Sequence, residues 1–301
     1  MEFEWARSTV SSAGVELAVF EGGDPSGPVV VLVHGWPDTH HLWTDVAALL
    51  ASRFRVVAYD TRGMGESGHP GSDDGFALAR LAEDVRAVVD AVSPDEPVHL
   101  VGHDWGSIQC WEAVCEPWAQ DRIASYTSMS GPNIDHLGHW LRRSLGPPTP
   151  GGVLRVLRQG VASSYIPLFA SPLGPPVLRR MFGSRERWAR LLERTERIRP
   201  AEHHHAPTLP DDVVNGLAYY RANIGLRPTK PRERRTAVPV LLLVQTRDPA
   251  IRPDNLEETR RWVDDLERRE LPYGHWVALA RPDLVAREIS RFVDERASRP
   301  A

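Results

Sequence analysis

The sequence is short of cysteine, of lysine and of long apolar runs, and each scarcity excludes a class of protein. Its two cysteines, Cys110 and Cys115, fall on one expected helix at a poor spacing for a bridge, so we interpret them as small apolar side chains. Lys230 is the only lysine among 36 basic residues and the net charge is −4, so no overall basic field indicates a nucleic-acid partner. No run approaches the roughly 18 apolar residues of a membrane span. The N-terminal segment MEFEWARSTV is too acidic for a signal peptide, so we expect a cytoplasmic protein without an integral membrane segment.

What is present is an ordinary globular composition. The 301 residues are 42% hydrophobic and 25% charged, which excludes disorder, collagen and coiled coil and suffices for a closed core. The 26 prolines and the strong preference for arginine over lysine are attributed to coding bias.

Alternating strand and helix patterns fill the first part of the chain. Expected strands cover 15–20, 28–33, 54–60, 98–102 and 122–128, and expected helices cover 41–51, 76–92 and 107–117. Several of the strands are β-branched and apolar throughout, which is typical of strands buried on both faces. This order predicts an α/β fold with a parallel sheet covered by helices.

The pattern changes over residues 132–235, which are rich in proline, glycine, arginine and tryptophan and contain no convincing strand. Helices are expected there at 176–198 and 211–224. The first pattern then returns with a strand at 239–245, a helix at 254–266, a strand at 268–272 and a helix at 282–296. We therefore predict a core of residues 1–131 and 236–301 with a helical cap, 132–235, inserted into it.

The most informative segment is Gly102-His-Asp-Trp-Gly106, which follows an expected strand and precedes an expected helix. In the α/β-hydrolase fold this sharp turn presents a nucleophile at its third position, here Asp104. A carboxylate is ionised near neutrality and needs no base to activate it. It attacks saturated carbon by displacement and leaves an alkyl-enzyme ester.

Hydrolysis of such an ester requires water activated by a base, and histidine is suited to this near pH 7. The chain order nucleophile, acid, histidine selects Asp248 after the strand PVLLLVQ and His275 in LPYGHW. Asp248 would orient the imidazole and stabilise its cation. For His103, which neighbours the nucleophile, we favour a supporting role.

Two backbone N–H groups are expected to form an oxyanion hole. One belongs to Trp105, which follows the nucleophile, and the other to Trp36 in the loop Val33-His-Gly-Trp-Pro37. They would hold the charge on the Asp104 carbonyl oxygen during ester hydrolysis.

Two further features of the cap are open to a functional interpretation. The run His203-His204-His205 suggests a metal site, but adjacent histidines point in different directions and no acidic cluster accompanies them, so no metal is expected. Residues 141–200 hold twelve arginines and three glutamates. An anionic or lipid-like partner would explain this excess, but we favour a solvated face that pairs with the core or with another subunit.

Five parts of the sequence, taken together, resemble the α/β-hydrolase-fold epoxide hydrolases. They are HGWPDT (34–39), DTRGMGES (60–67), GHDWG (102–106), Asp248 and GHW (274–276). The resemblance implies a mostly parallel eight-stranded sheet with a helical cap, no cofactor, and conversion of a small hydrophobic epoxide to a vicinal diol. It also implies two cap tyrosines that hydrogen-bond the epoxide oxygen. The best matches are Tyr165, in Tyr-Ile-Pro-Leu-Phe-Ala-Ser-Pro, and Tyr220, in Ala-Tyr-Tyr-Arg. Tyr219 is the alternative to Tyr220. For the pair as a whole, the alternative is that both tyrosines only pack in the protein interior. A homodimer is a family-level expectation.

The cap matches this family less well than the core does, because the first tyrosine segment lacks a glutamine that the family often has. Haloalkane dehalogenases share the Asp nucleophile and the Trp after it, but they usually hold the halide with Asn where this chain has Trp36. A catalytically silent hydrolase-fold binding protein is the third alternative. Segments such as GHDWGSIQCWEAVCEP also resemble hydrolase domains sometimes fused to a short-chain dehydrogenase, and no such second domain is expected after the last helix.

Overall fold

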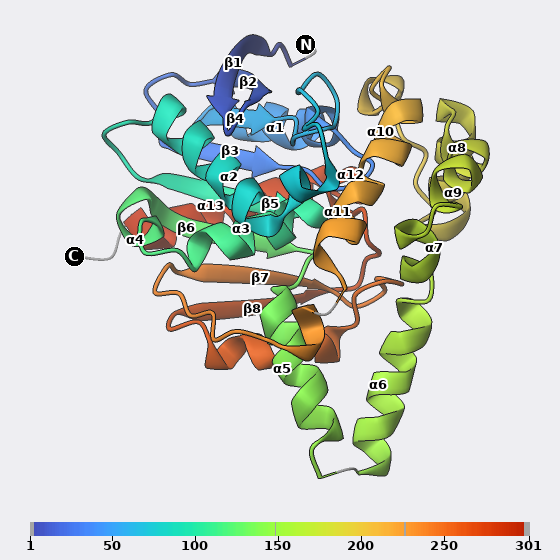
Figure 1. Cartoon of the computed structure of the whole chain (residues 1–301). Helices are drawn as coiled ribbons and strands as arrows, with labels where there is room; N and C mark the ends of the chain where they lie inside the picture. Colours follow the sequence, from blue (N-terminus) through green and yellow to red (C-terminus); the bar gives the residue numbers. More distant parts are fainter. Residues whose placement is uncertain (1–2, 148, 226, 298–301) are drawn as a thin grey trace.

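An eight-stranded sheet runs through the computed structural model, which describes residues 3–147, 149–225 and 227–297 (Figure 1). The strand order is β1-β2-β4-β3-β5-β6-β7-β8, in which β2 pairs antiparallel with β1 and β4 and all other pairs are parallel. The strands are β1 (Ala6–Ser12), β2 (Val15–Gly23), β3 (Val29–Val33), β4 (Arg55–Tyr59), β5 (Val98–His103), β6 (Ile123–Met129), β7 (Val240–Gln245) and β8 (Leu266–Leu271). The mostly parallel eight-stranded sheet is confirmed.

Helices cover both faces of the sheet because the central strands are apolar on both sides. On β3, Val31 and Val33 pack into one core cluster, whereas Val30 and Leu32 pack into the other. The helices of the core are α1 (Thr44–Leu50), α2 (Leu78–Val92), α3 (Trp105–Val114), α4 (Ala119–Arg122), α12 (Val277–Ala280) and α13 (Pro282–Ala297). Helices α2 and α3 contribute apolar side chains to the first cluster, and α1 and α13 to the second. None of the described helices is long and apolar enough to cross a membrane.

Two parts of the core differ from the prediction. Strand β1 was not expected; it is an edge strand whose first four residues are exposed, so it lacks the apolar run that marks the central strands. The helix expected over 254–266 is wrong, because this segment forms two short 3₁₀ turns, Pro253–Leu256 and Glu258–Arg261, and β8 starts at Leu266. Leu256 and Val263 are seven residues apart, a spacing that suits one face of a helix, but both reach the core cluster from these turns instead.

A helical insertion connects β6 to β7, and no strand lies in its described residues. Its helices are α5 (Ile134–Leu145), α6 (Pro150–Ala162), α7 (Ile166–Ala170), α8 (Gly174–Phe182), α9 (Arg185–Thr195), α10 (Leu209–Asn215) and α11 (Leu217–Asn223). Figure 1 shows α7 to α11 beside the sheet and the α5–α6 pair extending below it. The domain boundaries 1–131, 132–235 and 236–301 stay a prediction.

Both helices expected in the insertion are broken in two. The segment 176–198 divides between α8 and α9, where Ser184 caps α9 by accepting a hydrogen bond from the Arg187 amide. The segment 211–224 divides at Gly216, between α10 and α11. A Cβ atom at Gly216 would lie 2.2 Å from Cδ1 of Trp36, so this break lets the insertion approach the core closely.

Candidate active site

Asp104 occupies the sharp turn between β5 and α3. Its φ angle of 50° lies in the left-handed region, which L-residues other than glycine rarely adopt. The turn is tight enough that a Cβ atom at Gly106 would lie 2.2 Å from the carbonyl oxygen of Val33. Glycine at this position therefore allows α3 to start directly against β3, with Asp104 held at the carboxyl ends of the parallel strands.

The two amides predicted as an oxyanion hole both contact the Asp104 carboxylate. The Trp36 amide donates to Oδ2 over 2.9 Å, and the Trp105 amide also donates to this carboxylate. Oδ1 faces His275, whose Nε2 lies 3.8 Å away. The two carboxylate oxygens thus have different surroundings, one held by a backbone amide and one next to the imidazole.

His275 follows β8 and Asp248 follows β7, so neighbouring parallel strands bring them together. Nδ1 of His275 and Oδ2 of Asp248 are 2.9 Å apart, and the other Asp248 oxygen accepts hydrogen bonds from the Ala250 and Ile251 amides. Both side chains are almost completely buried. The structure therefore brings together Asp104, His275 and Asp248.

The charges in this cluster shift one another's pKa. Burial raises the pKa of Asp104, against the opposing effects of His275 and the two amides. Burial alone would raise the pKa of Asp248 and lower that of His275, but their mutual attraction prevails in both cases. The pKa of Asp248 is lowered, and the pKa of His275 is raised to about 9 with a contribution from Asp104.

Several neighbours surround His275 and Trp276, and only His103 among them was considered in the sequence analysis. The His103 ring, whose supporting role was expected, lies with Nε2 2.9 Å from the His275 carbonyl oxygen, which also accepts from the Ser130 hydroxyl. The His275 amide donates to the carboxylate of Glu196, which reaches in from the insertion. On the other side, the indole N–H of Trp276 donates to Asp38 over 2.9 Å, and burial raises the pKa of Asp38 to about 7.

Tyr165 and Tyr220 meet above Asp104. Both line the space around its carboxylate, and their hydroxyl groups hydrogen-bond each other. Burial raises the pKa of both phenols, so they stay protonated and can donate. The alternative, Tyr219, is engaged elsewhere: its hydroxyl donates to the Arg62 carbonyl oxygen over 2.7 Å and lies 2.8 Å from the Thr61 hydroxyl.

Two cavities meet at Asp104 and the two tyrosines. The smaller, of about 200 Å³, has aromatic walls, chiefly Trp36, Phe169, Phe182, Trp188 and Trp276. The larger, of about 290 Å³, extends between α5 and α6 and has mostly aliphatic walls, among them Ile134, Leu137, Leu141, Val156 and Ile166. The arrangement can hold an apolar molecule with its reacting carbon next to a buried carboxylate.

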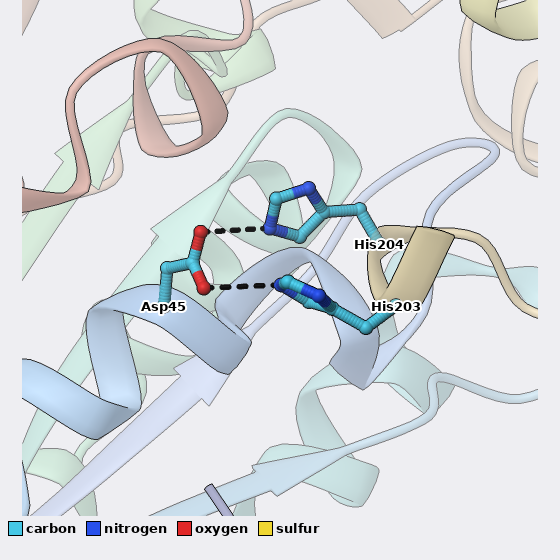
Figure 2. A group of neighbouring side chains, drawn as sticks. All are labelled: Asp45, His203 and His204. Carbon is cyan, nitrogen blue, oxygen red and sulfur yellow. Dashed lines mark hydrogen bonds and ion pairs between the residues drawn. The ribbon is translucent and has the colours of Figure 1, made fainter. Parts of the chain in front are cut away.

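The histidine run of the insertion makes a contact that the sequence analysis did not foresee. His203 and His204 do not diverge; their Nε2 atoms lie 3.0 and 2.9 Å from the two oxygens of Asp45 on α1 (Figure 2). Nδ1 of His204 accepts from the Ala201 amide, so the proton of the neutral ring is on Nε2, facing Asp45. A metal-binding histidine usually donates from its second nitrogen. The geometry therefore favours a hydrogen-bonded contact between insertion and core over a metal site.

Comparison with known families agrees with the sheet and the turn at Asp104. A family model described as "alpha/beta hydrolase fold" matches residues 28–282. The chain belongs to the α/β-hydrolase fold family. The family places a nucleophile at the strand–turn–helix junction that Asp104 occupies here.

Individual relatives of this α/β hydrolase carry the names of epoxide hydrolases or of an oxidoreductase. It is 40% identical to "Probable oxidoreductase EphD" of Mycobacterium tuberculosis over 296 residues, which are 97% of this chain and 50% of EphD. The chain thus spans about half the length of the first curated relatives it matches. It is 24% identical to "Epoxide hydrolase 3" of Xenopus tropicalis over 298 residues, 95% of this chain and 77% of that protein.

A solved structure shares the fold over nearly the whole chain. It is described as one of the novel epoxide hydrolases from metagenomes of hot environments, with a TM-score of 0.78 and 23% identity over 97% of this chain and 99% of that one. At this identity the likeness shows the fold, and the substrate must be argued from the site.

Proposed function

We propose that this α/β hydrolase is an epoxide hydrolase that converts an apolar epoxide to a vicinal diol. The single observation that carries the proposal is the meeting of a buried carboxylate and two protonated phenols at the junction of two apolar cavities. A carboxylate opens an epoxide by attack on carbon, and a phenol donates a hydrogen bond to the oxygen as it becomes an alkoxide.

In the first step, Oδ1 of Asp104 attacks one epoxide carbon and the carbon–oxygen bond of the ring breaks. Oδ1 is the oxygen proposed because Oδ2 is held by the Trp36 amide. The electron pair of the broken bond goes to the epoxide oxygen, which takes a proton from Tyr165 or Tyr220. The product is a hydroxyalkyl ester on Asp104, with Oδ2 as its carbonyl oxygen in the oxyanion hole.

In the second step, His275 removes a proton from water, and the hydroxide attacks the carbonyl carbon of the ester. The amides of Trp36 and Trp105 then stabilise the charge that develops on the carbonyl oxygen. Cleavage of the ester releases the diol and restores the Asp104 carboxylate. The net reaction adds one water to the epoxide and consumes no cofactor.

Alkylation of Asp104 also prepares His275 for its role. With pKa about 9, His275 is a cation at neutral pH in the resting state, and a cation cannot accept a proton. Part of this rise comes from the Asp104 charge, which disappears when the ester forms. The pKa of His275 therefore falls when the ester forms. Its resting proton returns to the phenolate left on Tyr165 or Tyr220, and the neutral imidazole can then take a proton from water and end the cycle as a cation again.

The competing function is haloalkane dehalogenation, since a halide could be displaced by the same carboxylate. A departing halide needs no proton, so it would make no use of the hydroxyl pair of Tyr165 and Tyr220. A silent binding protein would not need the imidazole of His275 between two carboxylates, hydrogen-bonded to Asp248 and 3.8 Å from Asp104.

The deciding experiment is incubation of the protein with an aromatic epoxide and, separately, with a bromoalkane. We expect diol from the epoxide and no bromide, and no diol with the Asp104→Ala variant. Bromide release without diol would replace the proposal by dehalogenation, and inertness toward both would favour a silent protein.

A single turnover in heavy-oxygen water tests the ester intermediate. Water attacks the carbonyl carbon of Asp104, so the label should enter Asp104 and be absent from the first diol formed. Label in that first diol without labelling of Asp104 would mean direct attack of water on the epoxide.

A further inference from the structure

The outer face of α6 exposes an unusual amount of apolar surface. Four of its side chains, Val153, Leu154, Leu157 and Val161, are exposed, Leu157 to 62% and Val161 to 75%. Because successive helix residues are about 100° apart, these four form one continuous stripe along the helix. We call these four residues the apolar stripe.

Positive charge accompanies the apolar stripe without any negative charge nearby in the sequence. Residues 136–185 contain seven arginines and no aspartate or glutamate. Arg155 and Arg158 lie along one side of the apolar stripe on the helix surface. Both are exposed, and neither has an ion-pair partner among the described residues. Of the two kinds of pairing expected for the arginine-rich face, with the core or with another subunit, pairing with the core is not made by Arg155 and Arg158.

The position of α6 makes this surface accessible. Helix α6 packs against α5, and the pair extends away from the sheet (Figure 1). Its inner side, with Val156 and Gly160, lines the larger cavity beside Asp104. One helix thus has a cavity on one side and an exposed apolar and cationic surface on the other.

We propose that the apolar stripe, with Arg155 and Arg158, docks this protein on the surface of an anionic lipid bilayer. Apolar side chains beside arginines are the composition of helices that lie in the membrane interface, where the apolar face enters the acyl boundary and the cations meet the headgroups. The α5–α6 pair would lie in the plane of the membrane surface, since no described helix can span a membrane.

A second copy of this chain fits the surface less well than a bilayer does. An isologous contact would bring Arg155 and Arg158 of both copies together, and no acidic residue between 136 and 185 is available to neutralise them. An anionic headgroup layer supplies the missing negative charge, and the acyl layer covers the apolar stripe.

Docking would also place the larger cavity next to the lipid. The helix that would enter the interface forms a wall of the cavity in which we propose that the epoxide binds. An apolar substrate dissolved in the membrane would then reach Asp104 without crossing bulk water. This consequence rests on the proposed function, whereas the docking itself does not.

The test is co-sedimentation of the protein with vesicles of phosphatidylcholine, with and without phosphatidylglycerol. We expect binding only to the vesicles that contain phosphatidylglycerol, and weaker binding as salt is added. Arg155→Gln with Arg158→Gln should weaken binding roughly 30-fold, since each arginine near an anionic surface contributes about a factor of five. Leu154→Gln, Leu157→Gln and Val161→Gln together should weaken it by at least about tenfold.

Matched controls change the same residue types elsewhere on the molecule. Arg80→Gln with Arg86→Gln removes two exposed arginines from α2, and Leu49→Gln removes an exposed leucine from α1. Both should bind vesicles as the parent does. An environment-sensitive fluorophore on Leu157→Cys should shift to the blue with phosphatidylglycerol vesicles, whereas one on Leu49→Cys should not.

Three outcomes would overturn the proposal. They are equal binding to both kinds of vesicle, unchanged binding by the α6 variants, and conversion of a dimer to a monomer by those variants without any effect on vesicles. Diol formation from a water-soluble epoxide should be the same in the α6 variants as in the parent. Failure of docking can therefore be told apart from failure of the proposed activity.

Discussion

At the scale of single residues, the proposed mechanism gives Asp104 and His275 separate tasks. If Asp104 forms the ester and His275 only hydrolyses it, His275→Gln should stop the cycle at the ester. We expect one equivalent of epoxide to remain on the protein, visible as an intact-protein mass increase equal to the epoxide. The mass should map to the peptide that contains Asp104, and Asp104→Asn should show none. Steady diol production by His275→Gln would contradict this division of tasks.

The electrostatic link between Asp104 and His275 can be measured directly. The pKa of His275 is raised to about 9 with Asp104 as one cause, so Asp104→Asn should lower it. The pKa should remain shifted upward by Asp248, which still accepts the hydrogen bond from Nδ1. Titration of the His275 ring by NMR, in the parent and in Asp104→Asn, tests this. An unchanged pKa would mean that alkylation does not prepare His275 to act as a base.

The two phenols should matter for ring opening and not for ester hydrolysis. Tyr165→Phe and Tyr220→Phe each remove one donor, and the double variant removes both, so alkylation of Asp104 should slow by about 10²-fold or more in the double variant. Stopped-flow tryptophan fluorescence would report the alkylation rate. Tyr219→Phe is the matched control, because its hydroxyl bonds to Thr61 and Arg62. Equal slowing by Tyr219→Phe would show a packing effect instead.

Local motifs explain why the sequence could predict the central residues of the site. Asp104, Asp248 and His275 each follow a strand of the core, and the carboxyl ends of neighbouring parallel strands meet at one edge of the sheet. Glu196 gave no such signal. Glu196 reaches the His275 amide only because the insertion folds back over the core, and such a contact leaves no pattern in the local sequence.

At the scale of elements, strands buried on both faces were predictable and half-exposed or irregular elements were not. Strand β3 is a continuous apolar run, whereas the first four residues of β1 are all exposed, so β1 could not be told from a loop. The segment 254–266 has charges that suit a helix, but tertiary contacts prevail: Glu258 is buried and paired with Arg143 of α5.

The buried side chain of Gln159 connects helix α6 to the core. Gln159 donates to the Ala250 carbonyl oxygen over 3.1 Å and accepts from the Asn255 side chain. Gln159→Leu would leave both partners without this hydrogen bond, so the free energy of unfolding should fall by about 2 kcal/mol. Urea unfolding measures this. As a control, Leu157→Ala on the outer face of α6 should change the free energy of unfolding by less than about 0.5 kcal/mol. A negligible loss for Gln159→Leu would show that apolar packing alone holds α6.

At the scale of the whole molecule, the insertion covers the carboxyl ends of the parallel strands and completes the walls of the site. Core elements supply Asp104, Asp248 and His275, whereas the insertion supplies Tyr165, Tyr220 and much of both cavity walls. The sequence predicted a helical cap, but the cavity volumes depend on where α5, α6 and α8 to α10 break and turn, which is decided by close contacts such as that of Gly216 with Trp36.

Because two cavities meet at Asp104, substrate shape should decide how a narrowed cavity affects the rate. An epoxide with a substituent on each carbon needs both cavities, whereas a terminal epoxide needs only one. Val156→Phe narrows the larger cavity and Leu191→Phe the smaller. Each should lower kcat/KM for the disubstituted epoxide by about tenfold or more, since overfilling a packed space costs about 1–3 kcal/mol. Each should leave kcat/KM for styrene oxide nearly unchanged, because its single ring can occupy the cavity that remains open. Equal losses for both substrates would mean that only one cavity admits substrate.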